Sequence, residues 1–287
     1  MLSQWFLVGP GRCGLQLVRA MTAAGIRVGG IETRSPAGRT RARRAAPGIP
    51  IWGPEAALPP AEGVLIAVPD SALAGCADAL ASRLDPATRV VLHTSGLVPA
   101  SVLGPVARKG RHLGSIHPLV SFPTATGPLV TLNGAVAAVE GDTSAVHEAC
   151  RLARSLGMRP VRLTAAAKPQ YHAAAAMAAN LTHTLVAAAR SLLVLSGLSE
   201  RGAVAALRPL VRGAVEAALM ARGIENLTGP LGRGDAWAVR THLAALPEPA
   251  AAAYRAVGNI AVAALAAQRL LRESQLQEMR RALTVLP

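Results

Sequence analysis

The sequence has very few aromatic residues and few cysteines. Phe, Trp and Tyr make up 2% of its 287 residues, although hydrophobic residues together make up 51%. Alanine, valine and leucine must therefore fill the helix and sheet faces, and the chain lacks an aromatic surface for stacking nucleic-acid bases. Cys13, Cys76 and Cys150 lie far apart and show no metal-ligand spacing. We expect reduced thiols in a cytoplasmic protein, and no metal site.

Acidic residues and lysines are also scarce. Asp and Glu number 16 against 30 Lys and Arg, which gives a formal net charge of +14. The basic residues are scattered apart from the cluster 34–44, so we expect general attraction of anions and no nucleic-acid partner. The apolar runs around 173–179 and 260–267 are shorter than the ~20 residues that span a bilayer, and no basic region precedes the apolar start. We therefore expect neither a membrane segment nor a signal peptide.

Three glycines near the start have the spacing G-x-G-x-x-G. An apolar run precedes Gly9, Gly11 and Gly14, and an amphipathic helix pattern follows them. In such a turn the first glycine bends the chain, the second lets a pyrophosphate approach, and the third lets the helix pack on the strand. The pattern predicts a dinucleotide-binding unit at the positive end of a helix. The predicted contacts are Gly9, Pro10, Gly11, Arg12, Cys13 and Gly14.

The end of the second predicted strand bears on which dinucleotide binds. Glu32 stands where an NAD-binding unit usually places an acid on the ribose hydroxyls. Arg34 and Ser35 follow at once, and a guanidinium beside a hydroxyl suits a ribose 2′-phosphate. For the later arginines, 39–44, a solvated helix start is the simpler interpretation. We expect NADP(H) rather than NAD(H), with Arg34 and Ser35 on the phosphate.

Strand and helix patterns alternate up to about residue 163. This alternation predicts a doubly wound, mostly parallel α/β Rossmann sheet over residues 1–163, with ligands at the carboxyl ends of the strands. Val68, Pro69 and Ser95 follow such strands and are expected cofactor contacts. From residue 164 to 287 the sequence is rich in Ala, Leu and Arg and helical in period, which predicts an all-α domain of four or five helices.

Two histidines end neighbouring predicted strands. His93 precedes Thr94-Ser95-Gly96, and His117 precedes Pro118. A histidine near a nicotinamide would act as a general acid, with a nearby hydroxyl to orient the substrate. The alternative is that each histidine satisfies backbone groups at a bend. We expect His117 in catalysis and His93 in substrate binding.

The first helix of the second domain holds Lys168, His172 and Asn180. Lysine is rare here, since Lys109 is the only other one, so Lys168 marks a place that needs a compact amine. Lys168 and His172 are four residues apart and share a helix face. Asn180 lies in an alanine run, where its amide needs a partner. We expect all three to be catalytic, with Lys168 binding or protonating the substrate; the alternative is a packed helix with Lys168 in solvent.

Glycines and a proline interrupt the helical pattern between residues 226 and 235. Thr228 and the free N–H groups of this bend would face an anion, and Arg233 would clamp a carboxylate. The alternative is an ordinary helix–helix turn in which Asp235 caps the following helix.

The ordered set of these motifs resembles the Rossmann-like proteins with a C-terminal DUF2520 domain, in the 6-phosphogluconate-dehydrogenase-like superfamily. Ketopantoate reductases and pyrroline-5-carboxylate reductases belong to the same superfamily. The resemblance rests on Gly9–Gly14, Val68-Pro-Asp70, His93–Gly96, Gly114–Leu119, Lys168 with Tyr171-His172, Asn180 and Leu227–Asp235. It implies an NADP-binding domain, a helical domain that dimerises, and a substrate cleft between them. In relatives a lysine and an asparagine on this helix bind and protonate substrate; here Lys168 and Asn180 are more widely separated, so His172 can take the asparagine's place.

Together these observations predict an NADPH-dependent reductase of a small, carboxylate-bearing C=O compound, first a 2-keto acid of the ketopantoate type. The alternatives are an imine reductase of the pyrroline-5-carboxylate type and a non-catalytic NADP(H) sensor. We expect a homodimer formed through the C-terminal helices.

Overall fold

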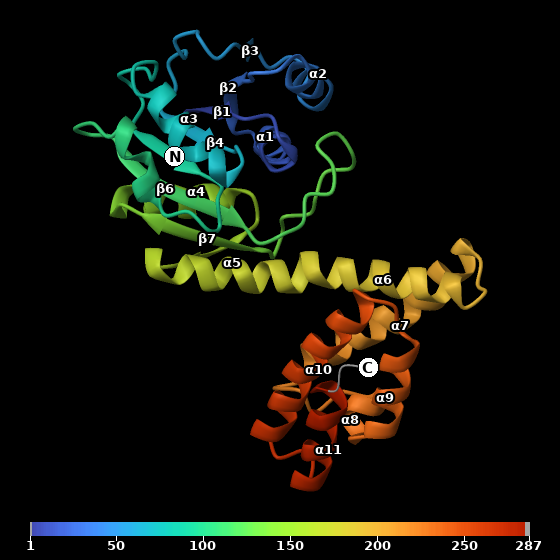
Figure 1. The fold of residues 1–287 in the computed structure, drawn as a ribbon. Helices are drawn as coiled ribbons and strands as arrows, with labels where there is room; N and C mark the ends of the chain where they lie inside the picture. Colours follow the sequence, from blue (N-terminus) through green and yellow to red (C-terminus); the bar gives the residue numbers. More distant parts are fainter. Residues whose placement is uncertain (1, 285–287) are drawn as a thin grey trace. The chain divides into compact units, whose positions relative to one another are not determined.

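The computed structural model describes residues 2–284 and divides the chain into two compact units, one ending at Asn180 and the other starting at Leu181. The first unit is an α/β domain, and the second is built from helices alone (Figure 1). The sequence places the division at residues 163 and 164, where the alternation of strands and helices ends. In the structure the first unit extends further, to a point inside a helix, because the start of this helix packs on the sheet domain.

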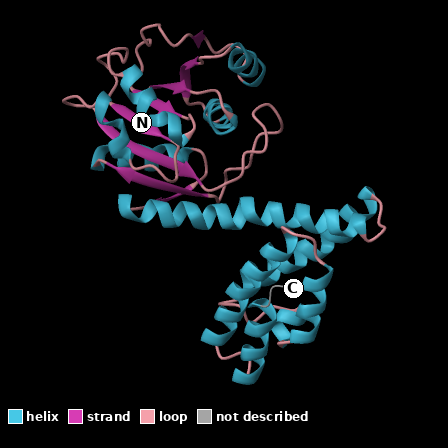
Figure 2. Cartoon of the chain, in the orientation of Figure 1, coloured by secondary structure: helices cyan, strands magenta, loops and turns pink. Residues whose placement is uncertain are grey.

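The first unit contains an eight-stranded sheet (Figure 2). The strands are β1 Gln4–Val8, β2 Arg27–Glu32, β3 Ile51–Trp52, β4 Gly63–Ile66, β5 Val90–His93, β6 His112–Pro118, β7 Val136–Gly141 and β8 Arg159–Arg162. Their order is β3-β2-β1-β4-β5-β6-β7-β8, and only the β6–β7 pair is antiparallel. The predicted doubly wound, mostly parallel sheet is confirmed. Because the chain winds outward in both directions from β1 and β4, ligands are expected at the carboxyl ends of these two strands.

Alternating residues of the strands supply two separate cores. Leu7, Leu65 and Leu92 face the larger core, which includes apolar residues of α1 and α4. Val64 and Ile66 face the other core, on α3 and η2. The helices of this unit are α1 Arg12–Ala23, α2 Pro36–Ala45, η1 Asp70–Ala72, α3 Leu73–Leu80, η2 Ala100–Val106 and α4 Thr143–Ser155. A sheet covered on both faces explains why its central strands read as continuous apolar runs.

One long helical stretch leads from the first unit into the second. It comprises a 3-10 turn at Ala165–Ala167, α5 at Lys168–Ala176, a π-helical segment at Met177–Leu181 and α6 at Thr182–Leu195. The remaining helices are α7 Glu200–Met220, α8 Gly229–Arg233, α9 Ala236–Ala245, α10 Ala250–Ala267 and α11 Glu273–Thr284. The core of this unit joins α9, α10 and α11 around Val239, Leu265 and Met279. The predicted helical second domain is confirmed.

Two helices are longer and more apolar than we expected from the lengths of the apolar runs in the sequence. Ala165–Leu195 and Ala250–Ala267 are long and apolar enough to cross a membrane, judged by length and composition alone. The expectation that every apolar run is too short is therefore wrong. Isolated polar residues interrupt the runs in the sequence but do not interrupt the helices. The same criterion is met by core helices of soluble proteins, so two such helices are weak evidence of a membrane protein.

Candidate functional site

The glycine turn joins β1 to α1 in the predicted conformation. Gly9 has a φ of 99°, and a Cβ there would lie 2.6 Å from the carbonyl oxygen of Ala67. A Cβ on Gly14 would lie 2.5 Å from the carbonyl oxygen of Gly9, so this glycine lets the helix approach the strand. Gly11 is different, because its Cβ would meet nothing closer than 3.6 Å. Gly11 is also the N-cap of α1 and supplies no side-chain acceptor to the first-turn amides. The amide-rich end of α1 thus suits an anion.

A groove of about 310 Å³ lies beside this turn, and we call it the glycine-loop groove. Its lining residues are Val8, Gly9, Pro10, Gly11, Glu32, Thr33, Arg34, Ser35, Arg41, Ala67, Val68, Pro69 and Cys76. Seven of the predicted cofactor contacts meet here: Gly9, Pro10, Gly11, Arg34, Ser35, Val68 and Pro69. Arg12 and Gly14 lie outside the lining, Gly14 because it is buried beneath the turn.

The charges at the end of β2 favour an anion in this groove. Glu32 is 2% exposed, and its Oε2 accepts a hydrogen bond from Nη2 of Arg83 at 2.7 Å. Arg34 and Arg41 are exposed, and neither forms an ion pair within residues 2–284. The Ser35 hydroxyl accepts the Gly38 N–H at 3.0 Å and keeps its own proton for another acceptor.

Arg41 was not singled out from the sequence, where it stood among arginines interpreted as solvated. It lies on α2 one turn after Gly38, whose amide the Ser35 hydroxyl caps. Unlike Arg39, Arg43 and Arg44 on the same helix, it lines the glycine-loop groove. The local sequence pattern does not separate it from those three arginines.

A second cavity, of about 200 Å³, lies at the carboxyl ends of β4, β5 and β6, and we call it the histidine pocket. Its lining residues are Cys13, Asp70, Thr94, Ser95, Gly96, His117, Pro118, Val120, Phe122 and His172. Of the predicted site residues, it brings together His117, His172, Ser95 and Cys13. A Cβ on Gly96 would lie 2.9 Å from ring atoms of both His117 and His172. Only glycine fits at position 96 without displacing the two rings.

The histidine at the end of β6 is held neutral. Nδ1 of His117 lies 2.9 Å from the hydroxyl oxygen of Tyr171, and the two rings meet edge-on. Burial, with the neighbouring His172 and Lys168, lowers the pKa of His117 to about 4, against an opposing effect of Asp70. Burial raises the pKa of Tyr171 to about 12. At neutral pH the pocket is therefore lined by an uncharged His117 imidazole, which is hydrogen-bonded to the protonated phenol of Tyr171.

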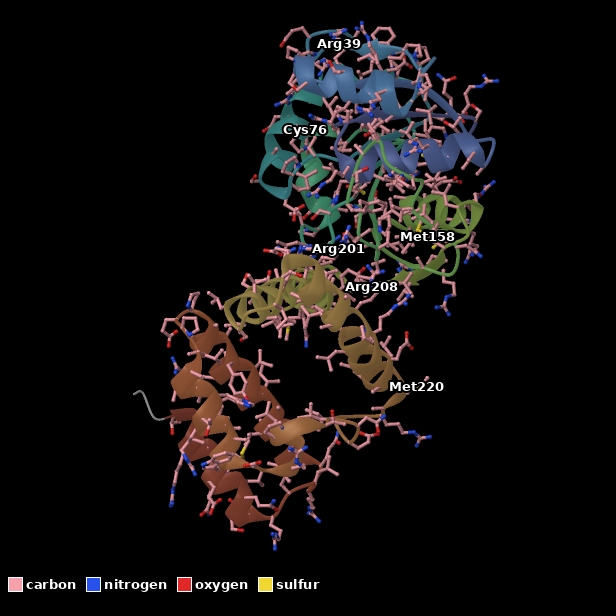
Figure 3. All side chains as sticks on the ribbon, turned by 90° about the vertical axis from the view of Figure 1, so that its right-hand side faces the viewer. Arg39, Cys76, Met158, Arg201, Arg208 and Met220 are labelled. Carbon is pink, nitrogen blue, oxygen red and sulfur yellow. The ribbon has the colours of Figure 1, made fainter. Side chains whose placement is uncertain are left out.

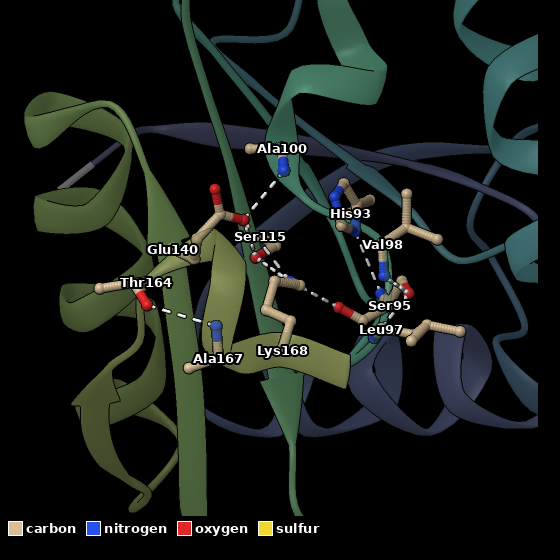
Figure 4. Close-up of polar contacts among 10 residues, drawn as sticks. All are labelled: His93, Ser95, Leu97, Val98, Ala100, Ser115, Glu140, Thr164, Ala167 and Lys168. Carbon is tan, nitrogen blue, oxygen red and sulfur yellow. Dashed lines mark hydrogen bonds and ion pairs between the residues drawn. The ribbon is translucent and has the colours of Figure 1, made fainter. Parts of the chain in front are cut away.

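Lys168 lies behind the wall of the histidine pocket and not on its lining. It is 2% exposed, and its Nζ donates to Ser115 Oγ at 2.8 Å and to the Ser95 carbonyl oxygen at 3.1 Å (Figure 4). Oε2 of Glu140 lies 3.5 Å from the same nitrogen. Burial lowers the pKa of Lys168, and the Glu140 carboxylate opposes this effect. The sequence predicted Lys168 in the cleft, whereas the structure places its amine among protein oxygens.

His93 is also an interior residue. It has 0% exposure, and its Nδ1 accepts the Ser95 N–H at 3.1 Å. Burial, followed by the nearby Lys168 charge, lowers the pKa of His93 to about 3. The Ser95 hydroxyl in turn accepts the N–H groups of Leu97 and Val98. His93 thus fixes the turn after β5 and does not line the pocket. This is the alternative given above, in which the histidine satisfies backbone groups at a bend.

A long loop from β6 to β7 supplies the apolar wall of the pocket, with Val120 and Phe122. Gln16 of α1 is 2% exposed and holds this loop. Its Nε2 donates to the carbonyl oxygens of Thr124 at 3.0 Å and Pro128 at 3.1 Å. Its Oε1 accepts the Val130 N–H at 3.0 Å. Gln16 was not predicted from the sequence, although a lone amide on the buried face of an amphipathic helix was a usable signal.

The other predicted site residues do not line either of these two cavities. Asn180 is exposed, in the π-helical segment. Thr228 lines a cavity of about 450 Å³ formed by α7 and the following loop, within the second unit. Arg233 is exposed at the end of α8. Oδ1 of Asp235 accepts the Ala238 N–H at 3.0 Å, which confirms the predicted cap of α9.

Comparisons with known families and folds agree with this architecture. Residues 4–118 match the Rossmann-like domain family, and residues 135–261 match the domain of unknown function DUF2520. The chain thus carries a Rossmann-like domain followed by a DUF2520 domain, and the predicted resemblance is confirmed. A comparison with curated protein sequences gives no significant match.

Several solved structures share the fold over nearly the whole chain. A Bacteroides fragilis protein assigned as an NADP oxidoreductase aligns with a TM-score of 0.78 at 20% identity, covering 90% of this chain and 97% of its own. A Thermotoga maritima protein aligns with a TM-score of 0.68 at 23% identity, covering 92% and 99%. Pyrroline-5-carboxylate reductase of Streptococcus pyogenes aligns with a TM-score of 0.60 at 10% identity, covering 97% and 98%. At these identities the likeness establishes the fold.

Proposed function

We propose that this chain is an NADPH-dependent oxidoreductase that reduces a small C=O compound. The observation that carries the proposal is that the two cavities lie next to each other along one edge of the sheet. Pro69 lines the glycine-loop groove, and the next residue, Asp70, lines the histidine pocket. At the glycine turn, Gly11 lines the glycine-loop groove and Cys13 lines the histidine pocket. An extended dinucleotide with its phosphates at the glycine turn would reach from one cavity to the other.

The residues of the groove fit NADP(H). The first turn of α1 offers its amides beside Gly11, where no side chain obstructs a pyrophosphate. Arg34, Arg41 and the Ser35 hydroxyl offer two guanidinium groups and a donor for a ribose 2′-phosphate. Glu32, the residue that would select NAD(H), has its charge compensated by Arg83. The names of structural neighbours, which include an NADP oxidoreductase and NAD-linked dehydrogenases, support a nicotinamide dinucleotide.

The bound dinucleotide would supply the hydride, and this chain's residues would bind and polarise the acceptor. His117 lines the pocket and is neutral, so it can donate a hydrogen bond to a carbonyl oxygen without holding a charge in the resting state. Negative charge that develops on that oxygen would strengthen this hydrogen bond, so the neutral ring would stabilise the transition state as a donor, and water would supply the proton that the product oxygen takes up. Tyr171 fixes the ring through Nδ1. His172 stands edge-on to His117, with ring centroids 5.8 Å apart, and completes the polar wall.

The substrate is proposed to be small, because the histidine pocket holds about 200 Å³. Pro118, Val120 and Phe122 give it an apolar side that suits a short carbon chain. A 2-keto acid of the ketopantoate type is our first candidate and a cyclic imine the second.

We also propose that two copies of the chain associate through their helical units. Four large apolar side chains of this unit are between 68% and 80% exposed, which is unusual for side chains of this size. They are Leu195, Leu210, Leu219 and Met220, the last of which is labelled in Figure 3. A second copy would remove this apolar surface from water.

All three cysteines are free, which supports a reducing, cytoplasmic setting.

The proposed function is tested by titrating the purified protein with NADPH and NADH in a calorimeter, followed by NADPH oxidation assays with 2-keto acids and cyclic imines. We expect tight NADPH binding and turnover of one compound class. His117→Gln should abolish turnover and leave NADPH affinity unchanged. Binding without turnover of any compound would favour a sensor of NADP(H), and absence of nucleotide binding would overturn the proposal.

A further inference from the structure

Lys168 and Glu140 form a buried pair of opposite charges behind the histidine pocket. Their side chains come from α5 and β7, and both are nearly inaccessible, at 2% and 9% exposure. Glu140 pairs with Ser115 across the antiparallel β6–β7 ladder, which brings the Ser115 hydroxyl to the same point. No motif in the sequence pointed to Glu140, and Ser115 entered only as part of the Gly114–Leu119 motif.

Every N–H of the Lys168 ammonium has an oxygen of the protein within reach. The oxygens are Ser115 Oγ at 2.8 Å, the Ser95 carbonyl at 3.1 Å and Glu140 Oε2 at 3.5 Å (Figure 4). An ammonium has three donors, so all of them are used inside the wall. Oε2 of Glu140 also accepts the Ala100 N–H at 2.9 Å and the Ser115 O–H at 3.2 Å. The pair thereby joins β6, β7, the start of η2 and the turn after β5.

The turn after β5 is the part of this network that reaches the pocket. The Ser95 carbonyl accepts from Lys168, and Ser95 and Gly96 both line the pocket. A Cβ at Gly96 would already stand 2.9 Å from His117 and His172. A small displacement of this turn would therefore move the surface against which both imidazoles pack.

We propose that Glu140 is a positioning residue of this site: it holds the Lys168 ammonium within the wall, where Lys168 fixes the Ser95–Gly96 turn against the two histidines. Lys168 then acts through the backbone and does not donate a proton to substrate. The catalytic meaning of this assignment rests on the proposed function, whereas the pairing itself is tested without substrate.

The scarcity of lysine makes the pairing directly measurable. Protein labelled with ¹⁵N and ¹³C in lysine gives signals from only Lys109 and Lys168, and Lys109 is exposed. We expect the Lys168 ammonium protons to exchange with water at least ~10-fold more slowly than those of Lys109. In Glu140→Gln the titration midpoint of Lys168 should fall by about one pH unit or more, while that of Lys109 stays unchanged. Glu148→Gln, which removes a partly exposed partner of Arg151 on α4, is the matched control and should change neither.

Activity separates a positioning pair from a proton donor. If Lys168 only positions the turn, Lys168→Met and Glu140→Gln each leave one buried group unpaired, and the double variant removes both charges. The kcat of the double variant should then be at least ~10-fold higher than that of Lys168→Met. The NADPH affinity of all three variants should stay within about twofold of wild type. It should also unfold at a higher temperature than either single variant, which keeps the test usable if a single variant fails to fold.

Two results would overturn the assignment. One is a Lys168 signal that titrates and exchanges like that of Lys109 in the wild-type protein. The other is a double variant as inactive as Lys168→Met, because loss of a proton donor is not repaired by removing its counter-ion. Failure of the wild-type protein to bind NADPH would instead count against the proposed function and would leave the labelling result intact.

Discussion

Nη2 of Arg83 lies 2.7 Å from Oε2 of Glu32, and this pair neutralises the acid at the end of β2. Arg83 also donates to the carbonyl oxygen of Ala56, so its guanidinium is held in place from two sides. The acid that would accept ribose hydroxyls in an NAD site is thus already engaged within the protein. The charges left uncompensated at this end of the groove are those of Arg34 and Arg41.

Removing the Arg34 guanidinium should weaken NADPH binding and leave NADH binding unchanged. A charge-assisted hydrogen bond to a phosphate contributes about 1.5–3 kcal/mol, so Arg34→Ala should lower NADPH affinity by about 10- to 100-fold. Arg41→Ala should act in the same direction. Arg43→Ala is the control, since Arg43 is exposed on the same helix but does not line the groove. Calorimetry with both nucleotides measures the effect, and an equal loss for NADH would refute the 2′-phosphate assignment.

The glycines of the turn should separate stability from binding. Gly14→Ala forces a Cβ against the Gly9 carbonyl, and we expect a loss of about 1–3 kcal/mol in the free energy of unfolding. Gly11→Ala has room for its Cβ and should stay within about 0.5 kcal/mol of wild type. It should nevertheless weaken NADPH binding, because the methyl group faces the groove. Thermal unfolding and calorimetry on the two variants check this contrast; equal destabilisation by both would contradict it.

The two low-pKa histidines should make the protein less stable in mild acid. The pKa values of His93 and His117 are lowered to about 3 and about 4, against about 6.5 in an unfolded chain. Between pH 6.5 and 4 the unfolded chain therefore binds up to about two more protons at these positions than the folded chain. Stability should be complete above pH 6.5 and fall as the pH decreases, by up to about 1.4 kcal/mol per pH unit for each histidine.

The histidine contribution is isolated by denaturant unfolding at a series of pH values. His117→Gln should reduce the slope between pH 6 and 4.5 by about one proton. His147→Gln replaces an exposed histidine on α4 and should leave the slope as in wild type. An unchanged slope in His117→Gln would show that this imidazole is not held neutral by the fold.

Gln16 should control the order of the β6–β7 loop. In Gln16→Leu the Val130 N–H and two carbonyl oxygens lose their partner, which should cost about 1–3 kcal/mol. Hydrogen exchange at Val130 should quicken by about tenfold or more, and the apolar wall at Phe122 should loosen with it. Gln4→Leu is the control, since Gln4 bonds only to Pro60 at the other end of β1. Exchange at Val130 as slow as in wild type would show that the loop is held by other contacts.

Much of the fold was predictable because its signals are local. The glycine spacing, the apolar strands and the cap at Asp235 each depend on a few consecutive residues. The position of Lys168 was not predictable, since it depends on Glu140 and Ser115, which an antiparallel strand pair brings beneath the helix. The setting of Asn180 was not predictable either, since it lies in a π-helical segment, Met177–Leu181, that interrupts the regular α-helical spacing after Lys168.

With the amine of Lys168 sealed in the interior, the positive side-chain charge on the surface of this protein is carried mainly by guanidinium groups, apart from one exposed lysine in the turn before β6. Acylating reagents and amine cross-linkers that attack lysine side chains should modify Lys109 and spare Lys168. A fluorophore, an affinity tag or a surface linker can therefore be attached at one known side chain. Such a conjugate would keep both the glycine-loop groove and the histidine pocket chemically untouched.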